Sequence, residues 1–294
     1  MTETTFEILS LKLSSHVTTS SALILSLLDN PARPNSGASK SIAERGSVPQ
    51  IDMLKVNHDI LQAARGAYDH LNAFAATLLS RNQGGWAYGS LARSSVEHFA
   101  RAHFLLQASS PVDRYYRYMR SRIRAVSFLA NEQYRTYAAE WGVNAKEKEA
   151  EWTAELEALG GKGTYPNSQI SPPILAKALL RLTDEELAGT EDRSAAFYAM
   201  MASLSHGERP GTEYLINPDL HTDHALVLHP PGLTVDLEQF LAPVLFVKVK
   251  SMLALWAYFG VSTEESRAWG DECMDIAKYA NGIWHKSETQ REGA

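Results

Sequence analysis

Apolar residues recur every three or four positions through two long consecutive stretches of this chain, residues 50–81 and residues 86–108. That spacing lays one apolar stripe along a helix, whereas a half-buried strand would alternate apolar and polar residues. Gly84-Gly85 separates the two stretches and predicts a turn that sends the second helix back along the first. The sequence therefore predicts an all-α protein, an antiparallel helical bundle with long helices.

The same spacing predicts helices over much of the remaining chain, at residues 5–30, 112–141, 146–159, 173–181, 184–188, 192–206, 235–260 and 263–284. Residues 207–234 differ, because prolines and glycines there separate short apolar pieces that suit strands. We expect a small β-hairpin flap over the bundle in that segment.

Composition divides the chain into four parts. Residues 1–30 form an N-terminal helical region, and residues 31–49 are rich in Pro, Gly and Ser without periodicity, which predicts an exposed and flexible linker. Residues 50–284 form the helical bundle domain, and residues 285–294 a polar tail. At 294 residues and 45% hydrophobic content, the chain can bury a sizeable core.

The net charge and the cysteine content limit which binding partners and which cellular compartment we expect for this protein. A net charge of −6 argues against a protein that coats duplex DNA, because such binding depends on many basic contacts. Cys273 is the single cysteine, so an internal disulfide is excluded and a reducing cytoplasm is expected. The most apolar stretch, residues 240–259, carries Lys248 and Lys250 near its middle, where lipid would make each costly. We therefore expect a buried helix and no membrane partner.

Several histidines raise the question of a metal. His206, His221, His224 and His229 are close in sequence, and neutral imidazoles are good metal ligands. Their spacing matches no ordinary zinc or iron site, and no histidine has a glutamate three residues before it. We expect no cofactor and no metal, with a metal on the histidines of 221–229 as the open alternative.

The helix predicted over residues 86–108 carries unusual charges for an apolar segment. Arg93, Glu97 and Arg101 follow at intervals of four, which stacks the charges in a favourable order along one stripe. His98 follows Arg93 by five residues, about 140° around the helix. A charge that faces inward must be paired. We predict that Glu97 is partly buried and contacts Arg93, Arg101 or a donor such as His206.

The helix predicted over residues 112–141 is the most basic part of the chain. Arg117, Arg120 and Arg124 share one face, and tyrosines such as Tyr116 are interleaved with them. Guanidinium groups for phosphates and aromatic rings for stacked bases could build a groove for single-stranded nucleic acid. The alternative is a solvated charged face that pairs with the acidic residues 147–157.

The segment Arg93-Ser94-Ser95-Val96-Glu97-His98 resembles the Arg-x4-6-His motif of the HEPN superfamily. That resemblance implies a helical bundle, RNA as the substrate, metal-independent endoribonuclease activity, and a homodimer in which two copies of the motif face one cleft. The chain is also similar to uncharacterised actinobacterial helical proteins that pair an Arg-x3-Glu helix with a later Ser-His-Gly element. Here these would be Arg93 with Glu97, and residues 205–207.

The resemblance assigns roles to particular residues. His98 would be general base or acid, Arg93 would hold the scissile phosphate, and Glu97 would orient its neighbours, with His206 as a second acid or base. The substrate-binding residues would be Arg101, Arg117, Arg120, Arg124 and Tyr116. The alternative is a non-catalytic helical module that binds a partner protein or a small molecule. A shared cleft for Arg93 and His98 would favour the ribonuclease.

Overall fold

The computed structural model describes residues 3–31, 33–44, 51–79, 84–130, 134, 144–159, 171–187, 194–206 and 240–292. Within these ranges the regular structure is helical and no strand occurs, which confirms the prediction of an all-α protein. The predicted hairpin flap at 207–234 lies outside the described residues.

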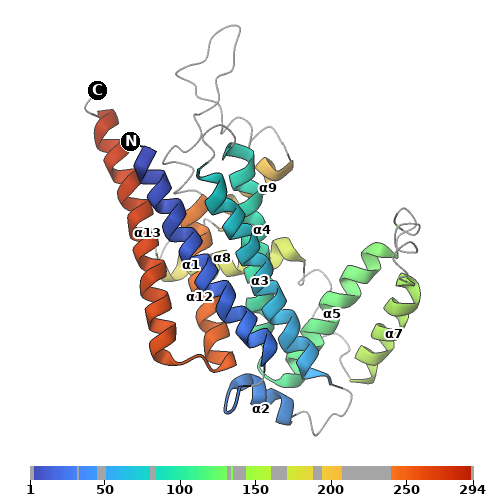
Figure 1. Ribbon diagram of the computed structural model, residues 1–294. Coiled ribbons are helices and arrows are strands. Elements are labelled where there is room, and N and C mark those ends of the chain that lie inside the picture. The colour runs from blue at the N-terminus through green and yellow to red at the C-terminus, as the bar shows by residue number, and fades with distance from the viewer. Residues whose placement is uncertain are drawn as a thin grey trace.

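The helices are α1 (Glu3–Asp29), α2 (Gly37–Glu44), α3 (Met53–Thr77), α4 (Gly84–Leu106), α5 (Pro111–Leu129), α7 (Ala145–Ala158), α8 (Pro172–Leu187), α9 (Ser194–His206), α12 (Ala242–Phe259) and α13 (Thr263–Glu292). Figure 1 shows α1, α3, α4, α12 and α13 side by side, with α5 and α7 forming a separate pair at the right. α4 is central, because it packs against α3, α5, α8, α9 and α12.

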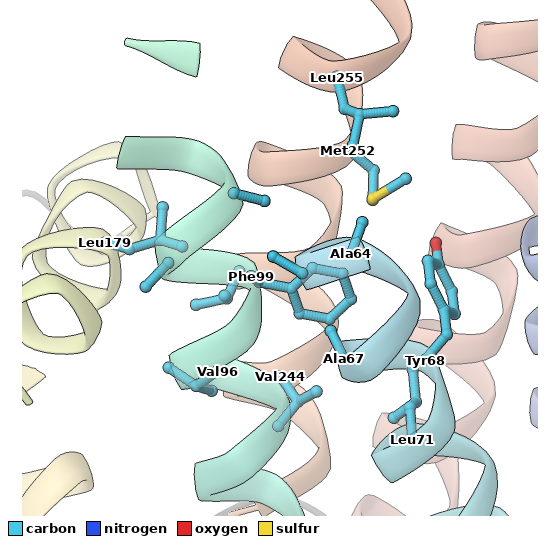
Figure 2. Packing of buried hydrophobic residues seen from close by; sticks show 14 of the residues in the cluster. Ala64, Ala67, Tyr68, Leu71, Val96, Phe99, Leu179, Val244, Met252 and Leu255 are labelled. Atoms are coloured by element: carbon cyan, nitrogen blue, oxygen red, sulfur yellow. The ribbon is translucent and has the colours of Figure 1, made fainter. Parts of the chain in front are cut away.

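The core lies where α3, α4 and α12 meet (Figure 2). Tyr68 of α3 meets Phe99 of α4 edge to face, with the ring centroids 5.6 Å apart, and both side chains are buried. The buried side chains of Met252 and Leu255 from α12 complete this part of the core (Figure 2). These residues belong to the apolar stripes that predicted the helices, so the periodicity also identified the buried faces.

The first helix belongs to the same core. Leu9 and Leu13 of α1 are fully buried, and α1 packs against α3 and α13. The Ser10 hydroxyl donates a hydrogen bond of 2.7 Å to the Ala75 carbonyl of α3. Such a bond satisfies a buried hydroxyl that would otherwise be costly. The N-terminal helical region is therefore joined to α3 by both apolar and polar contacts.

Residues 31–49 differ from the exposed linker that their composition predicts. Residues 37–44 form α2, whose Ala38 and Ser41 are buried. Ser36 caps this helix by accepting a hydrogen bond of 3.0 Å from the Ser39 amide. The prediction of an exposed linker is wrong for residues 37–44, because small residues allow α2 to pack closely against α12, where the Tyr258 hydroxyl donates to Ser41.

Some helix ends also differ from the predicted ones. Residues 172–187 form one helix, α8, where two were predicted, since no glycine or proline interrupts residues 174–187. α13 continues to Glu292, beyond residue 285, where the polar tail was predicted to begin. α5 ends at Leu129, earlier than the predicted residue 141, and beyond Ala130 the structure describes only Tyr134 before residue 144.

α12 is the helix, among those described, that is long and apolar enough to cross a membrane by length and composition. Of its residues, 56% are buried inside the protein, including Lys248. The Lys248 Nζ lies 3.5 Å from the Cys273 Sγ and 5.2 Å from the centre of the Trp269 ring. A buried core helix and a membrane-spanning helix can have the same length and composition, so α12 alone does not distinguish them. The absence of a membrane partner and the cytoplasmic location therefore stay predictions.

Candidate functional site

Four polar side chains from α4 and α9 meet in one cluster, which we call the quartet: Arg93, Glu97, Tyr198 and His206. The Arg93 Nε donates to the Glu97 Oε1 at 2.9 Å, and the Tyr198 hydroxyl donates to the same oxygen at 2.6 Å. The Arg93 Nη1 lies 2.8 Å from the His206 Nε2. The Arg93 and Glu97 side chains are 20% and 22% exposed, so the prediction for Glu97 is confirmed.

The quartet is held together by one carboxylate with two donors. Burial works against the charge of Arg93, but the hydrogen bond and negative charge of Glu97 outweigh it, so the pKa of the guanidinium is raised. Burial, with the hydrogen bond to Glu97 added, raises the pKa of Tyr198 to about 12. Tyr198 therefore stays a protonated donor at neutral pH, and Glu97 stays its acceptor.

The contact between Arg93 and His206 determines the state of the imidazole. A guanidinium donates and never accepts, so the His206 Nε2 must offer its lone pair to Arg93. His206 is then neutral and carries its proton on Nδ1. The residue is exposed at the end of α9, so a ligand that takes the place of the imidazole on Arg93 would release a free base.

A close approach of α4 and α9 at Gly89 positions the quartet. A Cβ atom at Gly89 would lie 2.8 Å from the Leu204 Cβ, nearer than side chains approach one another. Leu204 is buried two residues before His206. Glycine at this position therefore lets α9 lie close enough for His206 to reach α4.

His98 lies on a different side of α4. Its Nδ1 is 2.8 Å from the Ser94 carbonyl oxygen, so Nδ1 carries a proton and donates it to that oxygen. Its ring lies 5.2 Å from the His70 ring, between centroids, and a Cβ at Gly66 would be 2.6 Å from the His98 Cδ2. Burial, followed by the neighbouring His98, lowers the pKa of His70. His98 thus faces α3, whereas Arg93 faces α9.

Arg101 pairs with α3 and not with Glu97. Its Nη2 donates to both carboxylate oxygens of Asp59, at 2.8 Å and 2.9 Å. The Arg101 side chain is 42% exposed and that of Asp59 is 24% exposed. The predicted stripe of three charges therefore divides into the Arg93–Glu97 pair and a separate Arg101–Asp59 pair.

Two cavities flank the Arg101–Asp59 pair, and both are lined by Asp59, Gln62, Arg101, Ala125 and Leu129. The first, which we call the Glu97 cavity, has a volume of about 640 Å³ and is also lined by Glu97, His98 and Arg124. Arg93 is not among the described residues that line it. The second, the Trp152 cavity, has a volume of about 790 Å³ and is also lined by Trp152, Arg122 and Lys55. Both volumes fall in the range of small-molecule sites.

The side chains of the predicted nucleic-acid face of α5 mostly contact other residues of the protein. Arg117 donates to Asp113 and to the Phe104 carbonyl and is 12% exposed, while Tyr116 is buried. Arg120 lies over the Tyr116 ring, with its Cζ 5.6 Å from the centroid. Arg124 is exposed and lines the Glu97 cavity. Of these four residues, Arg124 is the one that lines either of the two cavities described above.

The acidic residues of α7 bind hydroxyl groups of α5. The Tyr115 hydroxyl donates to Glu155 and the Ser127 hydroxyl donates to Glu149. The hydrogen bond to Glu155 adds to burial in raising the pKa of Tyr115 above its usual range. The predicted contact between the basic helix and residues 147–157 is therefore present, but these two bonds come from uncharged donors.

Sequence reasoning gave no site role to three residues of this region: Asp59, Tyr198 and Arg122. Tyr198 precedes His206 by eight residues, so both lie near one face of a helix, and that spacing could have identified it. Arg122 stacks on Trp152, with its Cζ 4.2 Å from the ring centroid. No spacing links Asp59 to Arg101, because the two belong to different helices.

Among the residues that the structure describes, no group of three His, Cys, Asp or Glu side chains is placed to hold a metal ion. His221, His224 and His229 lie outside the described residues, so a metal on them is untested. Comparisons with protein-family models, with curated proteins and with solved structures found no match to this chain.

Proposed function

We propose that this protein is a metal-independent endoribonuclease whose catalytic groups are the quartet, within the antiparallel helical bundle that the sequence predicts. One observation supports this proposal above all: the Arg93 Nη1 lies 2.8 Å from the His206 Nε2, although the two residues are 113 positions apart in the chain. A guanidinium can hold a phosphate and stabilise its developing charge, and a neutral imidazole can act as the general base, so this pair could supply two of the functions that metal-free cleavage of RNA needs. The pair is thus Arg93 with His206, in place of Arg93 with His98.

Substrate binding would create the base. A scissile phosphate that accepts from the Arg93 Nη1 replaces the His206 Nε2 and frees its lone pair. His206 then removes the proton of a ribose 2′-hydroxyl, whose oxygen attacks the phosphorus and expels the 5′-oxygen. Glu97 and Tyr198 hold Arg93 in place throughout. The expelled 5′-oxygen takes its proton from solvent, because His98 faces α3, on a different side of α4 from Arg93.

The remaining parts of the proposal rest on the sequence. Residues 207–234 follow His206 directly, so the predicted hairpin flap would start beside the quartet. A homodimer would place two quartets near each other, and the products would be a 2′,3′-cyclic phosphate and a 5′-hydroxyl.

The test is incubation of the purified chain with single-stranded RNA in EDTA, read as new 5′-hydroxyl ends. We expect His206→Ala and Arg93→Lys to lower the cleavage rate by about 100-fold or more, because lysine cannot reproduce the guanidinium fork. Arg267→Lys, an exposed residue of α13, is the matched control. Cleavage that survives in both quartet variants, or that needs a divalent metal, would overturn the proposal.

A second candidate is a non-catalytic binding module, and a specific observation favours it. Arg93 and His98 face different helices, and the Arg93 Nε and Nη1 are both engaged within the protein. In that case the quartet is a structural network that connects α4 and α9. Quartet variants would then lower the melting temperature together, and neither they nor the parent would produce 5′-hydroxyl ends.

A further inference from the structure

We propose that the Trp152 cavity binds a small aromatic anion of the size of a nucleoside monophosphate. The cavity has a volume of about 790 Å³ and is lined from α3, α4, α5 and α7. That volume is enough for a small ligand, since such sites range from about 300 to 1,000 Å³. The site goes beyond the proposed function, because no residue of the quartet lines this cavity in the part of the chain that is described.

The charge of the lining favours an anion. Lys55, His58, Arg101 and Arg122 can each be positive, and Asp59 is the one acidic residue among the described lining residues. Asp59 offsets only Arg101. The Lys55 Nζ is 3.2 Å from Asp52, but this pair is mostly in solvent and contributes little. The cavity therefore presents excess positive charge.

Two guanidinium groups keep donors for a ligand. Arg101 binds Asp59 through Nη2 alone, and no described residue accepts a hydrogen bond from its Nη1. Arg122 donates from Nη1 to the Tyr118 hydroxyl at 2.6 Å, and no carboxylate within the described ranges forms an ion pair with it. A phosphate that accepts from these groups would form charge-assisted hydrogen bonds, which are stronger than neutral ones.

The remaining lining suits a flat ring. Trp152 supplies aromatic surface, and Leu54 is 46% exposed at the cavity. The Arg122 guanidinium already stacks on Trp152 at 4.2 Å, so planar groups pack well there. A base ring in this position would contact apolar surface while its phosphate reached Arg101. Neither a simple inorganic anion nor an uncharged nucleoside would use both features.

The experiment is calorimetric titration of the full chain at low salt with three probes: AMP, adenosine and inorganic phosphate. We expect saturable binding of AMP, and binding at least about tenfold weaker for adenosine and for phosphate, because each lacks one half of the contacts. Binding of AMP should weaken in high salt, since exposed charges are screened.

Variants locate the site. Arg122→Gln and Trp152→Ala should each weaken AMP binding by about tenfold or more, while Arg267→Gln on the exposed face of α13 should leave it unchanged. Circular dichroism confirms that each variant is folded, and Lys55→Gln offers a further test at an exposed residue if Trp152→Ala unfolds.

The outcomes separate this inference from the proposed function. His206→Ala should lower the rate of RNA cleavage by about 100-fold or more and leave AMP binding intact. AMP binding that is unchanged in Arg122→Gln and Trp152→Ala, equal affinity for adenosine and AMP, or no saturable binding up to millimolar AMP would each overturn the inference. Binding of phosphate as tight as that of AMP would show a simple anion site, and tighter binding of a single-stranded oligonucleotide would show a nucleic-acid surface; either would also overturn it.

Discussion

Replacing Glu97 with alanine tests the physical account of the quartet most directly. The carboxylate accepts from the Arg93 Nε at 2.9 Å and from the Tyr198 hydroxyl at 2.6 Å, and it is 22% exposed. A hydrogen bond to a charged group contributes about 1.5–3 kcal/mol, and a partly exposed ion pair under about 1 kcal/mol. Together the two contacts predict a loss of about 3 kcal/mol in the free energy of unfolding.

The assay is urea unfolding followed by circular dichroism, with the melting temperature as a second readout. For a chain of this size, about 3 kcal/mol corresponds to a fall of roughly 6–10 °C in melting temperature. Tyr198→Phe removes one hydroxyl and should cost about 1.5 kcal/mol. The double variant should lose less free energy of unfolding than the sum of the two single losses, because both substitutions remove the same hydrogen bond.

Glu151→Ala is the matched control. Glu151 also pairs with a basic side chain on its own helix, with the Lys148 Nζ at 2.6 Å, but the two side chains are 48% and 54% exposed. Water replaces such a pair, so we expect no measurable change in the unfolding midpoint. A Glu97→Ala protein as stable as the parent, or one no less stable than Glu151→Ala, would show that the Glu97 carboxylate does not stabilise the quartet.

Three further predictions follow from the packing. Gly89→Ala should displace α9 and lower RNA cleavage together with the melting temperature, whereas Gly270→Ala, with open space around it, should leave both unchanged or raise stability slightly. His16 is buried and its pKa falls to about 4, through burial and the nearby Lys248, with Glu272 opposing the shift. Below pH 6.5 the unfolded chain therefore binds a proton at His16 that the folded chain does not bind. The free energy of unfolding should fall by about 3 kcal/mol from pH 7.5 to pH 4 for this reason. In urea titrations, His16→Gln should make that fall smaller. Lys248→Met should raise the free energy of unfolding in urea titrations by about 1 kcal/mol, because burial lowers the pKa of this lysine and no carboxylate within the described residues pairs with it.

Periodicity in the sequence was enough to predict the long helices and their buried faces. Apolar spacing alone predicted α1, α3, α4 and α12, since a period near 3.6 residues marks one face of a helix whatever it packs against. It also predicted that Glu97 contacts Arg93, because residues four apart on a helix are neighbours. Both results depend on geometry within a single helix.

Contacts between helices depend on how distant segments pack together, and the sequence pattern did not predict them. Arg101 binds Asp59 and not Glu97, Tyr198 joins Glu97, and residues 37–44 form a helix against α12. Periodicity states which way a side chain points around its own axis, but not which helix lies there or how near. Close approaches such as that of Gly89 to Leu204 set those distances, and they arise from packing of segments more than 100 residues apart.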